Sequence, residues 1–164
     1  MSKEIRKGWG TEAQTAKPDF DTTNLGLLFP QNDAAEIAYI IMQIPHKWKL
    51  TTDLYPHVHW VQSQADVAVW KIDYRWYKNG ADPTGGFTTL TGAAHAYTYT
   101  AGSILQLTSF TAISGAGIDT VSSMLDIKLY RDDNTVAGDV LLKEFDIHFQ
   151  IDSPGSDAEG SKSF

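Results

Sequence analysis

Two histidines, His57 and His59, carry the clearest chemical signal in the sequence. They lie on an expected strand over residues 55–62, and side chains two positions apart on a strand point to the same face of its sheet. Two imidazoles placed in this way suit a shared metal ion such as Zn, Fe or Ni. The last expected strand carries Asp146 and His148 with the same spacing. If the two strands pair, these side chains converge, with His57, His59 and His148 as candidate metal ligands.

The residues after the histidine pair leave this metal site incomplete. In cupins, which are small jelly-roll proteins that hold a metal, a His-x-His pair is followed by a glutamate a few residues on and by a later histidine. Here residues 61–65 are Val, Gln, Ser, Gln and Ala. We therefore predict no metal and no cofactor, and we interpret the histidines as an outward-facing ladder that hydrogen-bonds or stacks on its neighbours. A histidine cluster at a subunit interface and a cupin-like metal-dependent enzyme are the alternatives.

The sequence lacks the patterns of several enzyme classes. There is no cysteine, which excludes thiolate nucleophiles, disulfides, zinc fingers and iron–sulfur clusters. No Gly-x-Ser-x-Gly elbow is present, and the segment at Gly115 and Gly117 lacks the Lys-Ser/Thr pair of a phosphate-binding loop. Paired carboxylates for glycoside hydrolysis stay open, because Asp and Glu are common. We predict that the protein is not an enzyme.

Length and charge restrict the classes of partner. The 164 residues, of which 42% are hydrophobic, are enough for one domain with a core. The formal net charge is -7, so DNA and RNA are not expected partners, because phosphate binding needs a basic surface. We expect no membrane partner and no secretory signal, since no long apolar run is present. The lack of cysteine fits synthesis in a reducing cytoplasm.

The rhythm of turn residues predicts an all-β fold. From residue 24 onward, short apolar or alternating runs stand between recurring turn signals, which is typical of antiparallel sandwiches and barrels. We predict an antiparallel, jelly-roll-like β-sandwich of about eight strands over residues 24–152. An extended N-terminal arm over residues 1–23 and a flexible C-terminal tail over residues 153–164 flank it.

Three expected strands alternate clearly enough to predict their buried faces. The strand over residues 66–78 ends at Asn79 and Gly80, which predicts a hairpin. Weaker strands are expected over residues 87–90 and 97–100. The side chains expected to point into the core are, strand by strand, Ala68, Trp70, Ile72, Tyr74 and Trp76; Leu125, Ile127 and Leu129; and Phe145, Ile147, Phe149 and Ile151.

Two groups of residues are candidates for binding a partner. The N-terminal arm is locally basic on an acidic chain and holds a tryptophan between two glycines. We interpret it as a docking arm that orders on its partner, with a disordered terminus as the alternative. Two further tryptophans near prolines and strand ends are expected to be exposed anchors at a contact surface. The predicted partner-binding residues are Arg6, Lys7, Trp9, Lys17, Trp48 and Trp60.

Two regions of the chain resemble a recurrent pattern in small virion proteins of tailed bacteriophages. The first is Ile-Pro-His-Lys-Trp-Lys at residues 44–49 with Thr-Asp-Leu-Tyr-Pro-His-Val-His-Trp at residues 52–60. The second is Leu-Tyr-Arg-Asp at residues 129–132 with Leu-Leu-Lys-Glu-Phe-Asp-Ile-His-Phe at residues 141–149. The resemblance extends over residues 36–151. It implies a β-sandwich among the head and tail components, with no catalytic residues.

The resemblance implies a capsid decoration or cement protein on the surface of the phage head. The expected partners are the major capsid protein and further copies of the chain, with a homotrimer favoured. The protein would be made in the cytoplasm of the host bacterium and would act in the virion. The alternative is a tail-tip, fibre or knob module that binds a host-surface glycan or receptor through exposed aromatics such as Trp48 and Trp60.

Overall fold

The computed structural model describes residues 18–31, 34, 36–94, 96–132 and 138–152. These ranges contain nine β-strands and no helix. Their β-branched and aromatic residues fit a pleated, half-buried surface, which favours strands. In chain order the strands are β1 (Asp19–Asp21), β2 (Gly26–Phe29), β3 (Ala38–Gln43), β4 (Leu54–Gln62), β5 (Trp70–Tyr77), β6 (Thr88–Thr91), β7 (Ile104–Ser109), β8 (Met124–Arg131) and β9 (Val140–Phe149).

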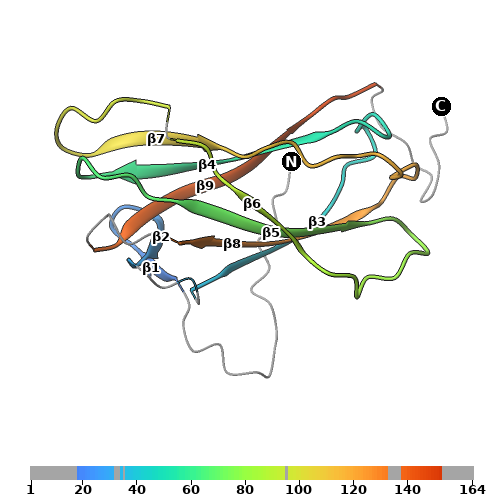
Figure 1. The fold of residues 1–164 in the computed structure, drawn as a ribbon, viewed down its shortest axis with the longest axis horizontal. Helices are drawn as coiled ribbons and strands as arrows, with labels where there is room; N and C mark the ends of the chain where they lie inside the picture. The colour runs from blue at the N-terminus through green and yellow to red at the C-terminus, as the bar shows by residue number, and fades with distance from the viewer. Residues whose placement is uncertain (1–17, 32–33, 35, 95, 133–137, 153–164) are drawn as a thin grey trace.

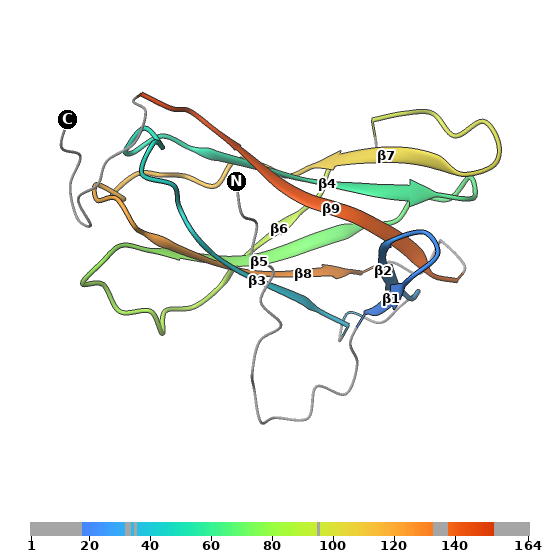
Figure 2. The same ribbon diagram turned by 180° about the vertical axis from the view of Figure 1, so that it is seen from behind.

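The strands form two sheets stacked as layers (Figures 1 and 2). The first sheet has five strands in the order β1-β2-β9-β4-β7, and the second has four in the order β3-β8-β5-β6. All the pairings between these strands are antiparallel. In Figure 1, β4, β7 and β9 lie above β3, β5 and β8. The predicted all-β antiparallel sandwich is therefore confirmed, while its jelly-roll form stays a prediction.

The core lies between the two sheets and is centred on aromatic rings. Phe29 of β2, Trp60 of β4 and Trp70 of β5 are completely buried. The Trp70 ring meets Phe29 edge-on, with the ring centroids 5.1 Å apart, and its centroid lies 6.4 Å from that of Trp60. Aromatic pairs at such separations stabilise a core beyond the area they bury. Since β5 belongs to the other sheet, these contacts hold the two layers together.

The buried faces predicted from alternation are confirmed, with one exception. The inward side chains of β5 and β8, and those of Phe145, Ile147 and Phe149 on β9, lie in the core or pack against it. The prediction that Ile151 points inward is wrong, because its side chain is 60% exposed. It lies beyond the end of β9, where an isolated bridge to Trp48 follows the ladder. Strand alternation no longer fixes its direction there.

Two local predictions differ from the structure. Residues 97–100 form no strand. The backbone of Tyr97 instead donates to Oε1 and accepts from Nε2 of Gln106, at 3.0 and 2.7 Å, so a buried amide side chain satisfies groups that a neighbouring strand would otherwise pair. The expected hairpin after β5 exists as the β5–β6 pair, but residues 78–87 connect the two strands in place of a tight turn at Asn79 and Gly80.

The sandwich begins earlier in the chain than the predicted boundary at residue 24. Residues 19–21, inside the predicted arm, form β1 and pair with β2. The Asp21 carboxylate then closes the turn by accepting from the backbone amides of Thr23 and Asn24, at 2.8 and 3.0 Å. Residues 1–17 and 153–164 lie outside the described residues.

One buried cation links the two sheets. Arg131, at the end of β8, is fully buried. Its Nη1 donates to the carbonyl oxygen of Phe29 on β2, at 3.0 Å, and to that of Gly138, at 2.7 Å. A buried charge is tolerated only where its donors are satisfied. These hydrogen bonds therefore fix the end of β8 against a strand of the opposite sheet.

The outer face of the four-stranded sheet carries a polar network around Asp73 of β5. Its Oδ1 accepts hydrogen bonds from the hydroxyls of Thr89 on β6, at 2.6 Å, and of Tyr130 on β8, at 3.2 Å. Burial and the adjacent Asp73 carboxylate raise the pKa of Tyr130 to about 12. Both effects disfavour the charged phenolate.

The raised pKa of Tyr130 predicts a loss of stability at alkaline pH. The unfolded chain releases this proton at an ordinary pKa of 10.0, whereas the folded protein holds it to about 12. Between these values the folded state binds more protons, so the free energy of unfolding falls as the pH rises. We expect Tyr130→Phe to flatten this fall. Urea unfolding at closely spaced pH values measures it, and equal slopes in the two proteins would contradict the expectation.

Candidate functional site

The histidine pair lies on the outer face of the five-stranded sheet. β4 and β9 are neighbours in this sheet (Figures 1 and 2). The register places His57 opposite Asp146, and Tyr55 opposite His148. Val58 alternates with the two histidines of β4 and points into the core, so the histidines point outward. The convergence expected if these two strands pair is therefore observed.

Three of these side chains form a compact cluster, which we call the His–Asp–His cluster: His57, Asp146 and His148. One ligand-capable atom of each lies within 4.8 Å of the other two. Nε2 of His57 is 3.8 Å from Oδ2 of Asp146, and the rings of His57 and His148 meet edge-on with centroids 4.5 Å apart. His59 stays outside this group, although its ring centroid is 5.1 Å from that of His57. The ring contacts agree with the predicted histidine ladder.

The surroundings of His57 favour its neutral form. Burial is the largest cause that lowers the pKa of His57 below its ordinary value of 6.5, and the neighbouring His148 lowers it further. The carboxylate of Asp146 acts in the opposite direction. A neutral imidazole keeps one ring nitrogen as an acceptor of a hydrogen bond or a ligand of a metal.

A row of apolar side chains crosses the same outer face further along β4. Val61 pairs with Leu105 of β7 and with Leu141 of β9, and Leu141 pairs in turn with Leu28 of β2. Leu105 is 55% exposed and the other three are half-buried. Side chains directly opposite on paired strands are in contact distance. These four residues therefore make one continuous strip, which we call the apolar row.

A shallow groove of about 350 Å³ runs along the apolar row. Three members of the row line it, namely Leu28, Val61 and Leu141. Lys143 stands at its side, and the ammonium group donates to the carbonyl oxygens of Asn24 and Leu25. The remaining lining is polar and consists of Asp21, Asn24, Ser63, Ser103 and Asp139. An apolar floor with a polar edge is the usual composition of a protein contact site.

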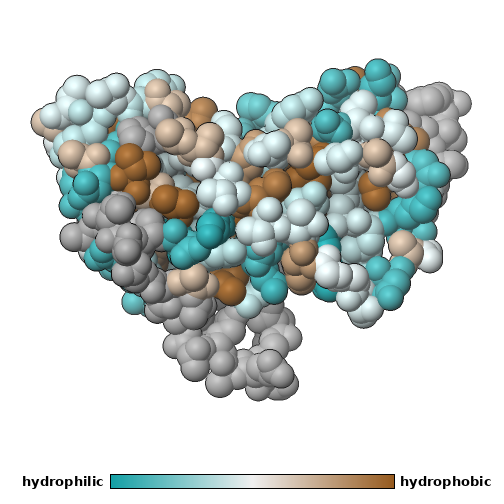
Figure 3. Space-filling model, viewed as in Figure 1, coloured by the Kyte–Doolittle hydropathy of each residue, from teal (hydrophilic) through white to brown (hydrophobic). Residues whose placement is uncertain are grey.

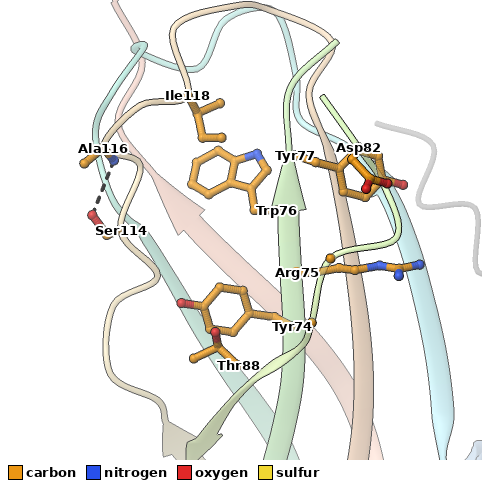
Figure 4. A pocket seen from close by; sticks show the side chains of 11 residues that line it. Tyr74, Arg75, Trp76, Tyr77, Asp82, Thr88, Ser114, Ala116 and Ile118 are labelled. Carbon is orange, nitrogen blue, oxygen red and sulfur yellow. Dashed lines mark hydrogen bonds between the residues drawn. The ribbon is translucent and has the colours of Figure 1, made fainter. Parts of the chain in front are cut away.

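A second hollow, of about 260 Å³, lies at the end of β5 (Figure 4). In Figure 4, Tyr74 and Trp76 point to one side of the strand, toward residues 114–118. Arg75 and Tyr77 point to the other side, where Tyr77 lies beside Asp82. Aromatic rings next to charged groups suit a small polar ligand with an apolar face, such as a sugar ring.

The prediction that Trp48 and Trp60 are exposed anchors is wrong. Their exposed fractions are 1% and 0%. Trp60 shares the inward face of β4, and its Nε1 donates to Oγ1 of Thr108 at 3.0 Å. The Trp48 ring packs on Trp76, with the centroids 5.0 Å apart. Strand alternation and ring packing, and not the nearby prolines, decide the exposure of both residues.

The other predicted partner-binding residues, Arg6, Lys7, Trp9 and Lys17, lie outside the described residues. The apolar row is a feature that the sequence reasoning missed. On β7 the usual pattern is inverted, because Gln106 and Thr108 are buried while Leu105 and Leu107, which alternate with them, face outward. A rule that places leucine inside therefore assigns this strand the wrong face.

Comparison of the chain with models of protein families, with curated proteins and with solved structures finds no match. Over the part of the chain that the structure describes, no helix has the length and hydrophobicity needed to cross a membrane.

Proposed function

We propose that the protein is a structural protein of a bacteriophage virion, and specifically a decoration protein that binds the major capsid protein of the assembled head. The observation that carries this proposal is the apolar row on the outer face of the five-stranded sheet. Contiguous apolar side chains on a water-facing surface are typical of protein contact sites. Their burial against a shell supplies a favourable free energy of association.

The resemblance to phage virion proteins supports the same proposal. One of its two regions includes most of β4 and the other includes most of β9, and these strands pair over most of their length. The parts of the resemblance on β4 and β9 thus lie side by side in the five-stranded sheet. The wide antiparallel faces also suit contacts between copies of the chain, and we propose a homotrimer on the head surface.

The distribution of charge supports a second contact between the protein and the capsid shell. The chain carries a net charge of -7, whereas its arm contributes Arg6, Lys7 and Lys17 around Trp9. We propose that this basic arm contacts the shell while the acidic body stays in solution. The apolar row then provides the main contact and the arm adds a salt-dependent one.

The test is to mix the full chain with purified heads of the phage that carries its gene and to image the particles by electron microscopy. Two matched variants place a charge on an exposed apolar residue. Leu105→Asp alters the apolar row, and Ile41→Asp alters the outer face of the opposite sheet, where Ile41 is 48% exposed. We expect symmetric added density with the wild type and with Ile41→Asp, and at least about tenfold weaker binding with Leu105→Asp.

Bare shells at moderate salt, with the wild-type protein in excess, would overturn the decoration proposal. If both variants still bind the shell, the apolar row is not the contact surface. Density at the tail vertex alone would favour the second candidate, a tail module that binds a host glycan. The aromatic hollow beside Tyr77 and Asp82 favours that candidate. Tyr77→Ala should then abolish binding to host surface polysaccharide.

A further inference from the structure

The His–Asp–His cluster offers three potential metal ligands, and one side of it is open to solvent. It offers two imidazoles and one carboxylate within 4.8 Å of one another. The three side chains differ in exposure: His57 is buried, Asp146 is half-buried and His148 is exposed. A small ion on this surface would thus have protein donors beneath it and water on the other side.

The two strands hold these donors in place. β4 is flanked by β7 and β9, and the hydrogen-bonded ladder fixes His57 between Ser109 and Asp146. Asp146 is further oriented by the backbone of the next residue, since its Oδ1 accepts from the amide of Ile147 at 2.7 Å. The other oxygen, Oδ2, is the one that lies 3.8 Å from Nε2 of His57. A carboxylate held at one oxygen presents the second to a ligand, as supporting contacts do at metal sites.

The spacing is close to that of a metal site. Zinc–ligand bonds to histidine and carboxylate are about 2.0–2.2 Å long, so donors around a tetrahedral ion stand about 3.4 Å apart. The donor atoms of the cluster lie within 4.8 Å of one another, so side-chain rotation has to shorten the longest separation by up to about 1.4 Å to reach this spacing. Nitrogen with oxygen donors suits Zn²⁺ and its first-row neighbours, whereas Ca²⁺ and Mg²⁺ require oxygen alone.

We propose that His57, Asp146 and His148 bind one divalent transition-metal ion, with a fourth coordination position open toward solvent. Asp146 provides the carboxylate that the sequence lacks after the histidine pair, and it does so from a different strand. This metal site stands apart from the proposed contact with a capsid, because it uses none of the residues of the apolar row. Either proposal holds if the other fails.

The experiment uses the untagged full chain, stripped with a chelator and then freed of it. Titration calorimetry with ZnCl₂ gives the stoichiometry and affinity, and CoCl₂ gives the visible absorption of the bound ion. We expect one Zn²⁺ per chain with a Kd below about 10 µM. His148→Asn and Asp146→Asn should each weaken binding by at least about tenfold.

His59→Asn is the matched control, because it removes a neighbouring histidine that lies outside the cluster. It should keep the wild-type affinity, and Zn²⁺ should raise the melting temperature of wild type and His59→Asn but not of His148→Asn. Since His148 is exposed, its variant is expected to fold, which far-UV circular dichroism checks. Absence of stoichiometric Zn²⁺ binding, or binding that both His148→Asn and Asp146→Asn retain, would overturn the metal site.

Discussion

Trp70→Ala is expected to lower the free energy of unfolding by about 3–5 kcal/mol. The Trp70 ring is fully buried and touches the rings of Phe29 and Trp60 from the opposite sheet. Truncation removes those contacts and leaves a cavity at the centre of the sandwich, where both layers meet. The total free energy of unfolding of a domain of this size is about 5–15 kcal/mol, so the expected loss is a large share of the total stability. Urea unfolding followed by far-UV circular dichroism measures it.

Two conservative variants separate ring packing from hydrogen bonding in the same core. Nε1 of Trp70 has no hydrogen-bond partner among the described residues, whereas Nε1 of Trp60 donates to the Thr108 hydroxyl. Trp60→Phe leaves that buried hydroxyl without its donor, and Trp70→Phe removes a group that was already unsatisfied. We therefore expect Trp60→Phe to be the more destabilising. A loss below about 1 kcal/mol for Trp70→Ala would contradict the central position of this ring.

Arg131→Met is expected to lower the free energy of unfolding by about 2–4 kcal/mol. The substitution keeps much of the apolar stem. It removes the guanidinium group that donates hydrogen bonds to the carbonyl oxygens of Phe29 and Gly138. A buried carbonyl without a donor keeps the full cost of its desolvation. The contact between the end of β8 and β2 is lost together with these bonds. Thermal and urea unfolding of the variant measure the effect.

Lys71→Met is the matched control for the arginine substitution. Lys71 is also a cation on the four-stranded sheet, and its ammonium pairs with Asp132 at 2.5 Å. Both side chains of this pair are partly exposed, at 28% and 44%, and pairs screened by water contribute little. We expect Lys71→Met to cost less than about 1 kcal/mol. Equal losses in the two variants would refute the role of Arg131 as a link between the sheets.

The proposed metal site and the apolar row share one face of the molecule. His57 and Val61 are four positions apart on β4, which corresponds to about 13 Å along a strand. Figure 3, which draws the view of Figure 1, shows hydrophobic side chains in several small groups separated by hydrophilic ones. Because this distance is short, one partner could touch both the proposed contact surface and the proposed metal ligands, and the two sets of variants test them separately.

The sequence by itself determined the fold class and the buried faces of the long strands. A period of two places Trp70 and Ile72 on one side of β5 and Lys71 on the other, and this pattern is local, so it can be read without knowing the partner strand. The same alternation put His57 and His59 on one face. The same alternation gives the position of Trp60, which shares the inward face of β4 with the buried Leu54 and Val58.

Only the tertiary structure decided which strands meet. The pairing of β4 with β9 joins residues that are far apart in the chain, and local sequence encodes the face of a strand but not its neighbour. This pairing alone brings Asp146 and His148 to His57, and it aligns Val61 with Leu141. The tertiary structure also decided that Leu105 of β7 faces water while Gln106 is buried, because the hydrogen bonds of Gln106 to Gln62 and Tyr97 exist only in the folded chain.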